Sequence, residues 1–458
     1  MPLRRILIAN RGEIAVRIIR SCRTLGIETV LAASEADRES LPARLADRVV
    51  CIGPGPARDS YLRATTIVQA ALGVRADAIH PGYGFLSERP ELATLCEQQQ
   101  LIFIGPTAAQ LAAVGDKLRA REFAAAAGVA TVPGGQIESG DAALALARQI
   151  GTPLLVKAAA GGGGRGMQRV ERLEDLPAAL QLAAAEAGAA FGDPRVYLER
   201  FVTHGRHVEV QVLGDGQGQV VQLGERDCSV QRRYQKLIEE TPAPGLNAAL
   251  RDQLHAAAAA FAQRLAYRGA GTVEFLVDTE RQACYFLEMN ARIQVEHPVT
   301  EAVTGIDLVA EQIAIADGAG LRFRQDEIRQ RGCAIECRVN AEDPQRDFAP
   351  CPGRIATASW PAAPGLRVDT HIESGSRVPP YYDSLLGKII AHAPDRQAAL
   401  RVLARAIDAT RIEGVTTNLQ FLGTVLQDAQ FAAGGVDTGF LQRFLADRQA
   451  PAESAPHG

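Results

Sequence analysis

The first hundred residues alternate short apolar runs with stretches in which apolar residues recur at helical spacing. The run at residues 6–9 leads directly into an amphipathic segment at residues 14–20, and this succession repeats along the chain. Strands that alternate with helices are typical of a parallel sheet covered by helices. We interpret these apolar runs as its strands: residues 6–9, 29–32, 48–52, 78–79 and 101–105.

Polar and glycine-rich residues follow two of these predicted strands. Asn10, Arg11 and Gly12 come after the first strand, and the segment HPGYG at residues 80–84 comes after the fourth. Open α/β sheets bind their ligands at the carboxyl ends of the strands. We therefore expect both segments to border a ligand site.

The rest of the chain mixes helical and extended patterns without an internal repeat. In chain order we predict a helical linker at 115–127, a strand at 154–157, an alanine-rich helix at 178–190, a strand at 196–199, β-structure at 207–223 and 271–297, strands and turns at 331–390, a helix at 398–408 and a disordered Pro/Ala/Ser-rich tail at 450–458.

Two segments with period-two alternation predict a β-hairpin. The short polar connection at residues 279–283 joins them, and a turn centred on Arg281 sets Glu274 directly opposite Glu288. The second segment, residues 284–296, places Leu287, Met289, Ile293 and Val295 on one face and Glu288, Asn290, Arg292, Gln294 and Glu296 on the other.

Facing glutamates repel each other unless a cation lies between them. Carboxylate oxygens together with substrate phosphates are the usual ligands of Mg²⁺, and Asn290 offers a further oxygen. The pattern thus predicts a metal site at Glu274, Glu288 and Asn290. The alternative is an exposed pair of glutamates on a hydrated sheet, and a register slip of one residue would remove the pairing.

The same polar face continues with groups suited to a small oxyanion. Arg292 and Gln294 offer hydrogen-bond donors of the kind that bind bicarbonate. Glu296 is a candidate general base beside Arg292, or simply the salt-bridge partner of that arginine.

A run of four glycines at residues 161–164 follows a predicted strand that contains Lys157. Glycine backbone N–H groups can surround phosphate oxygens, and a nearby lysine adds positive charge. The lysine precedes the glycines and no GK[ST] follows, so this segment is not a P-loop. A flexible surface turn is the alternative, and Lys157 favours a lid over phosphates.

The segment at residues 225–236 is dense in charge, and on that ground alone it would be interpreted as a solvated loop. Its polar groups do not follow helical spacing, and Gln231, Arg232, Arg233 and Lys236 together predict a patch that attracts anions.

Two more strands carry polar residues on one face. His207 shares a face with Glu209 and Gln211, and both a structural and a ligand-site role for this histidine stay open. In residues 334–342, Glu336, Arg338, Asn340 and Glu342 alternate with apolar residues, which suggests that this strand lines the same cleft.

Composition narrows the class of protein. A chain of 458 residues is too long to fold around a single hydrophobic core, so we expect two to four domains. The net charge of −4 excludes a general attraction to nucleic acid or anionic lipid, and no apolar run is long enough for a membrane span. The eight cysteines form no CxxC pair and no signal peptide precedes the first strand, so we expect reduced thiols and a cytoplasmic protein.

Taken together, these segments resemble the biotin carboxylase branch of the ATP-grasp family. The resemblance runs in order from residue 6 to about residue 440. It rests on the motifs IANRGEIAVRIIR, HPGYGFLSE, GGGGRGM, RHVEVQV, ERDCSVQRR, EMNARIQVEHPVTE, ECRVNAED and PPYYDSLLGK.

The resemblance implies a mixed α/β and α+β fold in three parts. These are a pre-ATP-grasp parallel α/β domain (1–114), an ATP-grasp domain (115–330) with a mobile glycine-rich lid at about 131–203, and a C-terminal biotin carboxylase domain (331–445), followed by a disordered tail (446–458). It also implies that ATP phosphorylates bicarbonate to carboxyphosphate, and that biotin is then carboxylated with release of ADP and phosphate.

The resemblance assigns a role to individual residues. Arg292, Glu296, Lys236 and Arg338 are implied as catalytic, with Glu296 as base and Arg338 stabilising the biotin enolate. Bicarbonate and biotin are implied to bind at Lys236, Arg292, Gln294, the Val295 backbone, Arg338 and Tyr83, and Mg²⁺ or Mn²⁺ at Glu274, Glu288 and Asn290. Nucleotide contacts are implied for Lys117, Lys157, Gly163, Gly164, Glu199, Arg200, Phe201, Val202, His207, Gln231 and Tyr234.

The chain departs from the family pattern at three positions. Tyr234 replaces a frequent histidine on the nucleotide side, Ala291 a frequent threonine, and Arg200 a frequent lysine. None of them is an expected metal or bicarbonate residue. We therefore expect these departures to affect how the substrates are bound rather than whether the chain is active.

The partners are also expectations from the resemblance. The chain lacks the Met-Lys-Met tripeptide that carries biotin in the family, so we expect a biotin carboxyl carrier protein and a carboxyltransferase subunit in trans, as in acetyl-CoA carboxylase and fatty acid biosynthesis. A homodimer is expected by the same resemblance. One rival is another ATP-grasp ligase, which joins a carboxylate to an amine or carboxylates a purine precursor. The other is a non-catalytic nucleotide-binding subunit, against which the presence of Glu288, Arg292, Glu296 and Arg338 counts.

Overall fold

The computed structural model describes residues 3–137, 140–159 and 167–449. The predicted glycine loop, with Gly163 and Gly164, and the tail at residues 450–458 lie outside these ranges. Residues 446–449, expected in the tail, belong instead to helix α15 (Phe440–Gln449).

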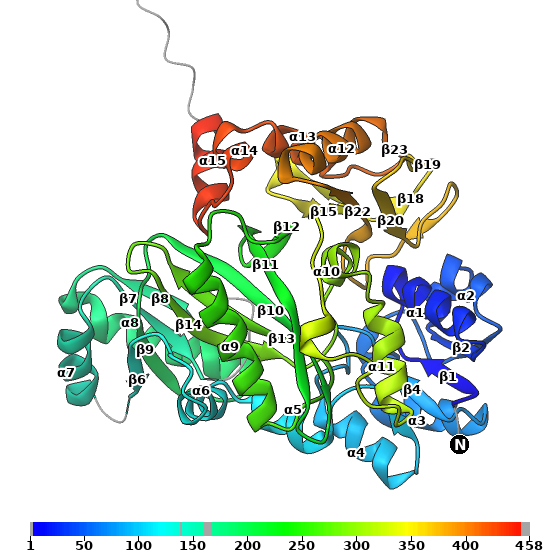
Figure 1. The fold of residues 1–458 in the computed structure, drawn as a ribbon, viewed down its shortest axis with the longest axis horizontal. Helices are drawn as coiled ribbons and strands as arrows, with labels where there is room; N and C mark the ends of the chain where they lie inside the picture. Colours follow the sequence, from blue (N-terminus) through cyan, green and yellow to red (C-terminus); the bar gives the residue numbers. More distant parts are fainter. Residues whose placement is uncertain (1–2, 138–139, 160–166, 450–458) are drawn as a thin grey trace, which may run out of the picture.

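A five-stranded parallel sheet forms the N-terminal part, as predicted (Figure 1). Its strands are almost continuous apolar runs because helices cover both faces. In the order β3-β2-β1-β4-β5 they are β3 (Arg48–Cys51), β2 (Glu28–Ala33), β1 (Arg5–Ile8), β4 (Ala78–His80) and β5 (Ile102–Phe103). The helices are α1 (Gly12–Thr24), α2 (Leu41–Leu45), α3 (Ala64–Gly73), α4 (Pro90–Gln98) and α5 (Ala108–Gly115), and α6 (Lys117–Ala126) links this part to the rest of the chain.

A small antiparallel sheet with its own apolar core follows in the chain. It projects from the rest of the molecule at the left of Figure 1. Its order is β6 (Gly134–Gln136), β9 (Val196–Arg200), β7 (Leu154–Ala158) and β8 (Met167–Val170), and it carries helices α7 (Gly140–Ile150) and α8 (Leu176–Phe191).

An eight-stranded antiparallel sheet dominates the centre and reaches into the C-terminal part without a break. The strands contributed before and after residue 330 meet where β12 pairs with β15. In sheet order the strands are β14 (Ala283–Asn290), β13 (Arg268–Asp278), β10 (Gly205–Asp215), β11 (Val220–Arg232), β12 (Gln235–Thr241), β15 (Cys333–Asn340), β22 (Leu385–Ala393) and β20 (Leu366–Thr370).

Helices cover both faces of this sheet, but on one face they leave a strip of polar residues uncovered. Helix α9 (Ala248–Arg264) buries the apolar face of β10 and β11, while α10 (His297–Thr304) covers Ala334 and Ile390 on the opposite face. The remaining helices are α11 (Leu308–Ala316), α12 (Arg396–Ala409), α13 (Leu419–Leu426) and α14 (Ala429–Ala433). Three short strand pairs complete the C-terminal part: β16 (Glu342–Asp343) with β17 (Ala349–Pro350), β18 (Gly353–Arg354) with β21 (Arg377–Val378), and β19 (Thr357–Ser359) with β23 (Arg411–Glu413).

The predicted hairpin forms, but its second strand is shorter than we expected. Strand β14 ends at Asn290, and residues 291–296 are irregular backbone that leads into α10. A β-bulge between Glu274 and Phe275 shifts the pairing, so Phe275 faces Phe286 while Glu274 still faces Glu288. The bulge also corrects the assignment of Leu287 to the apolar face, because Phe286 is buried there and Leu287 is only half-buried.

The segment 225–236 is not the solvated loop that was its default interpretation. It forms the end of β11 and the start of β12, joined at Arg233 and Tyr234, which both have positive φ. Arg232 and Arg233 both pair with Asp347, and Lys236 contacts three carboxylates, so the predicted anion-attracting patch carries its own counter-charges.

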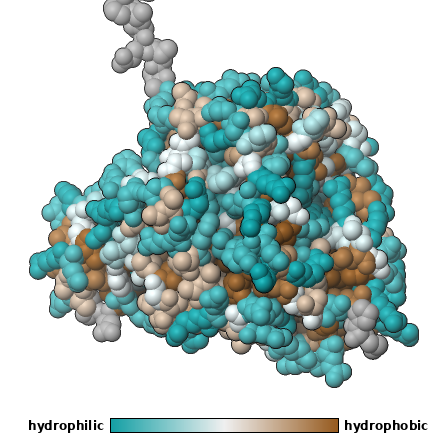
Figure 2. Space-filling view, in the orientation of Figure 1, coloured by the Kyte–Doolittle hydropathy of each residue, from teal (hydrophilic) through white to brown (hydrophobic). Residues whose placement is uncertain are grey.

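Figure 2 shows one face of the molecule, largely hydrophilic with scattered hydrophobic residues. None of the helices in the described ranges is long and apolar enough to cross a membrane. All eight cysteines are free thiols, and six of them are buried.

Candidate active site

A row of charged residues crosses four strands on the polar face of the large sheet. Alternation on β10 directs Val208 and Val210 toward the core under α9 and leaves Glu209 on the other face. Glu209 lies opposite Arg226 on β11 and opposite Glu274 on β13, and Glu274 lies opposite Glu288 on β14. The pairing register alone therefore assembles this row from residues up to 79 positions apart (209 and 288).

The ammonium group of Lys236 lies among three buried carboxylates. Its Nζ is 2.5 Å from Glu209 Oε2, 2.9 Å from Glu274 Oε1 and 2.8 Å from Glu296 Oε1. Burial lowers the pKa of Lys236, but the three carboxylates outweigh it and raise this pKa well above its ordinary value. Lys236 is thus a fixed positive charge at the centre of the site.

The same lysine sets the ionisation of two of its partners. Burial alone would raise the pKa of Glu274 and of Glu296. For Glu274 the charges of Lys236 and His207 reverse that effect, and for Glu296 those of Lys236, Arg338 and Arg226 do so. Both pKa values lie well below the ordinary range, so both groups are carboxylates at neutral pH.

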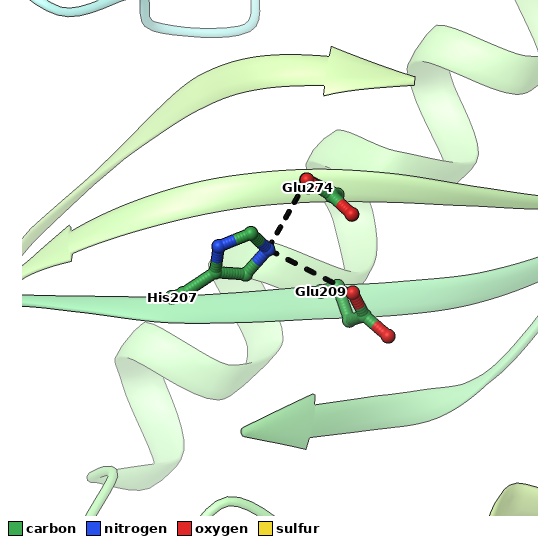
Figure 3. Close-up of side chains that lie close together, drawn as sticks. All are labelled: His207, Glu209 and Glu274. Atoms are coloured by element: carbon green, nitrogen blue, oxygen red, sulfur yellow. Dashed lines mark ion pairs between the residues drawn. The ribbon is translucent and has the colours of Figure 1, made fainter. Parts of the chain in front are cut away.

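His207 points between two of these carboxylates (Figure 3). Its Nε2 lies 3.1 Å from Glu274 Oε2 on the neighbouring strand and 3.8 Å from Glu209 Oε2 on its own strand. On its other side, Nδ1 lies 3.0 Å from the Gln231 amide nitrogen. The pKa of His207 is raised, since the charge of Glu274 outweighs burial.

Arg226 is fully buried beneath the site and holds several of its segments together. Its guanidinium donates to Glu209 Oε1 at 2.6 Å and to Gln294 Oε1 at 2.9 Å. It also donates to the side chains of Gln211, Thr272 and Thr300. One arginine thus holds a strand carboxylate, the 291–296 loop and helix α10 in a fixed relation.

Glu296 is joined to the C-terminal part through Arg338 on β15. The Arg338 guanidinium donates to Glu296 Oε2 at 2.9 Å and to Glu239 Oε1 at 2.6 Å. Of the strand predicted at residues 334–342 to line the cleft, Arg338 therefore lies at the same site as Glu296.

The loop at residues 291–296 places the remaining predicted oxyanion residues. Arg292 donates to Asn290 Oδ1 at 2.9 Å and lies 3.0 Å from Glu88 Oε2, while Gln294 donates to Glu274 Oε1 at 2.8 Å. The Val295 carbonyl accepts a hydrogen bond of 2.7 Å from Lys388. These side chains converge although they do not belong to a strand.

A cavity of about 120 Å³ lies between the N-terminal and C-terminal parts. Tyr83 lines it, and the Tyr83 hydroxyl donates to Glu13, which Lys388 also contacts at 3.0 Å. Asn10 fixes the 80–84 segment by donating to the carbonyl groups of Pro81 and Tyr83. The two loops expected to border a ligand site do meet; the cavity is lined by Asn10, Arg11, Gly12, Glu13, Tyr83, Gly84, Phe85, His371, Asp383 and Leu385.

Among the residues expected near the nucleotide, Lys157, Glu199 and Arg200 lie on the small sheet, whereas His207 and Gln231 lie on the large one. Lys157 donates to Glu199 Oε2 at 2.7 Å, and Arg121 contacts the other oxygen of that carboxylate. Lys117 lies 3.5 Å from Glu288 Oε2 and so connects the group to the hairpin. Arg200 is half-buried, Phe201 packs under Arg169, Val202 is buried, and Tyr234 is 61% exposed at the β11–β12 turn.

Among the described residues, two groups of His, Cys, Asp or Glu lie close enough to hold a metal ion. They are His207–Glu209–Glu274 and Glu209–Cys228–Glu296. The predicted trio differs from both: Glu274 and Glu288 face each other in the register, and Asn290 donates to Glu274 Oε1 at 2.8 Å.

Sequence reasoning did not assign Arg226, Glu239, Lys388, Arg121 or Glu88 to the site. The contacts of the first three depend on which strands become neighbours, and no local pattern reports that order. Arg121 and Glu88 lie in other parts of the molecule. The density of charge in the segment ERDCS was the one local signal for Arg226; its burial, which demands partners, is a finding of the structure.

Three protein-family models match successive parts of the chain. They describe the N-terminal domain of biotin carboxylase (residues 2–111), the ATP-binding domain of the carbamoyl-phosphate synthase L chain (116–324) and the biotin carboxylase C-terminal domain (336–443).

Known proteins resemble the chain over nearly its whole length. A biotin carboxylase from Nostoc sp. is 50% identical over 444 residues, which cover 96% of this chain and 99% of that protein. The biotin carboxylase domain dimer of Hydrogenobacter thermophilus 2-oxoglutarate carboxylase, solved with MgADP, ADP and bicarbonate, is 44% identical with a TM-score of 0.93 and covers 97% of this chain and 98% of that one. The Campylobacter jejuni biotin carboxylase–β,γ-ATP complex is 43% identical, with a TM-score of 0.93 and coverage of 96% and 99%.

Proposed function

The chain belongs to the biotin carboxylase family, and from this premise we propose that it uses ATP to join bicarbonate to biotin. The reaction is an ATP-dependent ligation that passes through carboxyphosphate and gives ADP, phosphate and carboxybiotin. The observation that carries it is the Lys236–Glu296–Arg338 group, in which a carboxylate base lies between two fixed cations. The family membership and this group do not favour an ATP-grasp ligase of the carboxylate–amine type.

Bicarbonate is proposed to bind where the donors of the site converge. Arg292, Gln294 and the Val295 backbone lie on the loop beside Glu296, and Lys236 provides a compact positive charge. A base must be ionised to remove a proton, and the depressed pKa of Glu296 keeps it so across the physiological range. Glu296 is proposed to take the bicarbonate proton, and Arg338 to stabilise negative charge on biotin.

Two carboxylates and an amide oxygen fit a divalent cation that also contacts phosphate. Glu274 and Glu288 face each other in the strand register, and Asn290 follows on the same strand. We propose these three as ligands of Mg²⁺ or Mn²⁺, which when bound would neutralise phosphate charge.

ATP is proposed to lie between the small sheet and the hairpin. Lys117, which reaches Glu288, and Lys157, held by Glu199, are suited to phosphate contacts. Glu199 to Val202 are proposed to frame the adenine, and His207, Gln231 and Tyr234 to border the nucleotide. The role of Gly163 and Gly164 as a cover over the phosphates remains a prediction.

Biotin is proposed to enter the cavity lined by Tyr83 and to reach Arg338 from there. It would arrive on a separate biotin carboxyl carrier protein and leave for a carboxyltransferase subunit, as in acetyl-CoA carboxylase. A cytoplasmic location agrees with eight free thiols, which persist in reducing compartments. A homodimer is proposed by analogy with the Hydrogenobacter domain dimer.

We propose the same three-part division that the sequence suggests, 1–114, 115–330 and 331–445, with a lid at about 131–203. The separate core of the small sheet supports a lid subdomain. Because the large sheet is continuous, the second and third parts are joined by hydrogen-bonded neighbouring strands.

Release of ADP by the purified chain tests the proposed function. With ATP, Mg²⁺ and bicarbonate, we expect free biotin to stimulate ADP release, and omission of bicarbonate to abolish that stimulation. Arg338→Ala should keep nucleotide binding and lose the stimulation by biotin, because its guanidinium holds Glu296, the proposed base, and is proposed to stabilise negative charge on biotin. ADP release that does not depend on bicarbonate would contradict the assignment, and a fully active Arg338→Ala variant would remove that residue from the biotin site.

A further inference from the structure

Two glutamates with no role in the proposed chemistry face each other directly behind Arg338. Glu239 on β12 and Glu336 on β15 are register partners in the antiparallel pair that joins the two halves of the large sheet. Both residues are fully buried, with 0% exposure. Like charges directly opposite each other destabilise a strand pair, and burial without water makes the repulsion stronger.

The hydrogen bonds satisfy only one of the four carboxyl oxygens in this pair. Glu239 Oε1 accepts from Arg338 Nε at 2.6 Å. No donor among the described residues reaches Glu239 Oε2 or either oxygen of Glu336. A buried carboxylate without donors is costly, whereas a protonated carboxyl group can itself donate to the neighbouring carboxylate.

The positive charges around the pair are already engaged elsewhere. Lys388, the register partner of Arg338, donates to the Val295 carbonyl and contacts Glu13 at 3.0 Å. Arg338 is shared between Glu239 and Glu296. Within the described residues, the other charged groups nearby are Lys236 on β12, Glu296, and the mutually paired Arg367 and Asp369 on β20. The buried His297 is neutral, and burial raises the pKa of the Cys228 and Cys337 thiols, so neither thiol adds charge.

This balance compensates one negative charge in the pair but not two. Burial raises the pKa of both groups, that of Glu239 to about 7 and that of Glu336 well above its ordinary value. When two carboxyl groups share a site, one holds its proton far above the usual range. The arrangement favours an ionised Glu239, which keeps Arg338, and a protonated Glu336.

We propose that Glu239 and Glu336 share one proton, and that this pair positions Arg338 beside Glu296. The shared proton rests on the burial and the facing register of the two groups and does not depend on the proposed function, whereas its effect on turnover does. With the proton present, Glu239 holds Arg338 Nε and leaves the other guanidinium edge for Glu296. Loss of the proton puts a second negative charge between Arg338 and Lys388 and draws the guanidinium away from the base.

Infrared spectroscopy of the protein without substrates tests the shared proton. Near neutral pH, the wild-type spectrum minus that of Glu336→Gln should contain the carbonyl stretch of a protonated carboxyl group, because glutamine removes the proton-carrying partner at nearly equal volume. Titration of the wild type to alkaline pH should bleach the same band. The exposed Glu327→Gln exchange is the matched control and should give no such difference. A wild type without this band, or a band that Glu336→Gln leaves in place, would overturn the proposal whatever the enzyme's activity.

The pH profile of biotin-stimulated ADP release tests the positioning role. Wild-type turnover should fall on the alkaline side as the pair loses its proton, and in Glu336→Gln, which has no proton to lose, this limb should move to higher pH. Glu239→Gln should slow biotin-stimulated turnover about 10-fold or more with the KM for ATP unchanged, since a displaced Arg338 no longer aligns with the base. Identical alkaline limbs in wild type and Glu336→Gln, or full activity of Glu239→Gln, would exclude the positioning role.

Discussion

At the scale of single residues, the site is held by buried charges that each have more than one partner. Arg226 is the extreme case, because it has no exposed surface and donates to five side chains from four separate segments. Its charge keeps Glu209 in place, and Glu209 in turn holds Lys236. Arg226, which is not among the groups proposed to react, thereby fixes the Lys236 ammonium at the centre of the site.

Arg226→Met should be strongly destabilising, because it leaves Glu209 buried without the cation that its position requires. Breaking a buried pair from one side costs about 3–5 kcal/mol in the free energy of unfolding. Urea unfolding followed by circular dichroism measures this loss. The control Arg324→Ala removes an exposed pair with Asp326, and its effect should stay within about 1 kcal/mol. A loss for Arg226→Met as small as that of the control would contradict the anchoring role.

Local patterns predicted the residues of the site better than their partners. Period-two alternation identified the faces of Glu274, Glu288 and Arg338, because side-chain direction in a strand depends only on position in the chain. It did not reveal that Glu239 faces Glu336, or that Lys388 reaches Val295. Those contacts depend on the order of strands in the sheet, which the sequence pattern does not encode locally.

At the scale of elements, the irregular segment after β14 is where prediction and structure differ most. The alternation of residues 284–296 continues past the end of the strand. Buried donors hold the backbone there instead: neutral His297 donates from Nδ1 to the Gln294 carbonyl at 2.8 Å, and Lys388 donates to the Val295 carbonyl. Both donors come from outside the hairpin, so strand-like alternation could not distinguish this loop from a longer strand.

The β13–β14 hairpin should respond to a methyl group at Gly271. A Cβ there would come within 2.7 Å of Met289 Cε and Tyr267 Cε1, and Tyr267 is fully buried. Gly271→Ala should therefore destabilise the protein by about 1–3 kcal/mol through overpacking. Thermal unfolding measures it, and a raised Mg²⁺ requirement would report the accompanying shift of Glu288 and Asn290.

Gly73→Ala is the matched control for this exchange. Gly73 ends helix α3, and a Cβ there meets no atom within 4 Å. Alanine should be neutral or stabilise by up to about 1 kcal/mol, because it reduces the conformational freedom of the unfolded chain. Equal effects of the two exchanges would show that the space around Gly271 is not restrictive.

At the scale of the whole molecule, buried ion pairs connect the three parts of the chain. Glu13 from the N-terminal part contacts Lys388 from the C-terminal part, and that lysine donates to the loop of the central part. Arg17 and Arg367 both contact Glu301 on α10. The succession of strands and helices along the N-terminal part was predictable from sequence, but these junctions were not, since each joins residues at least 66 positions apart.

The Glu13–Lys388 pair should behave as one unit in a double-mutant cycle. Lys388→Met alone leaves Glu13 buried without its cation and should cost about 3–5 kcal/mol, whereas adding Glu13→Gln should recover much of that loss. Chemical unfolding of the four proteins measures the coupling. Arg44 and Glu373 provide a control pair that joins the same two parts but is half exposed, so its coupling should be below about 1 kcal/mol. Additive effects at Glu13 and Lys388 would mean that the two side chains stabilise the fold independently.

The large sheet has a consequence for dividing this protein into pieces. Strands β12 and β15 pair from Ile238–Cys337 to Thr241–Ala334, across the point where the ATP-grasp and C-terminal parts adjoin. A cut between α11 and β15 would leave two fragments that each end in an unpaired strand edge, with Glu239 on one edge and Glu336 on the other. Such edges are templates for strand addition, and each is the matching template for the other. The two fragments could therefore serve as the halves of a split reporter. Their reassembly would restore the contact of Arg338 with Glu296, and turnover would report that the halves have bound each other.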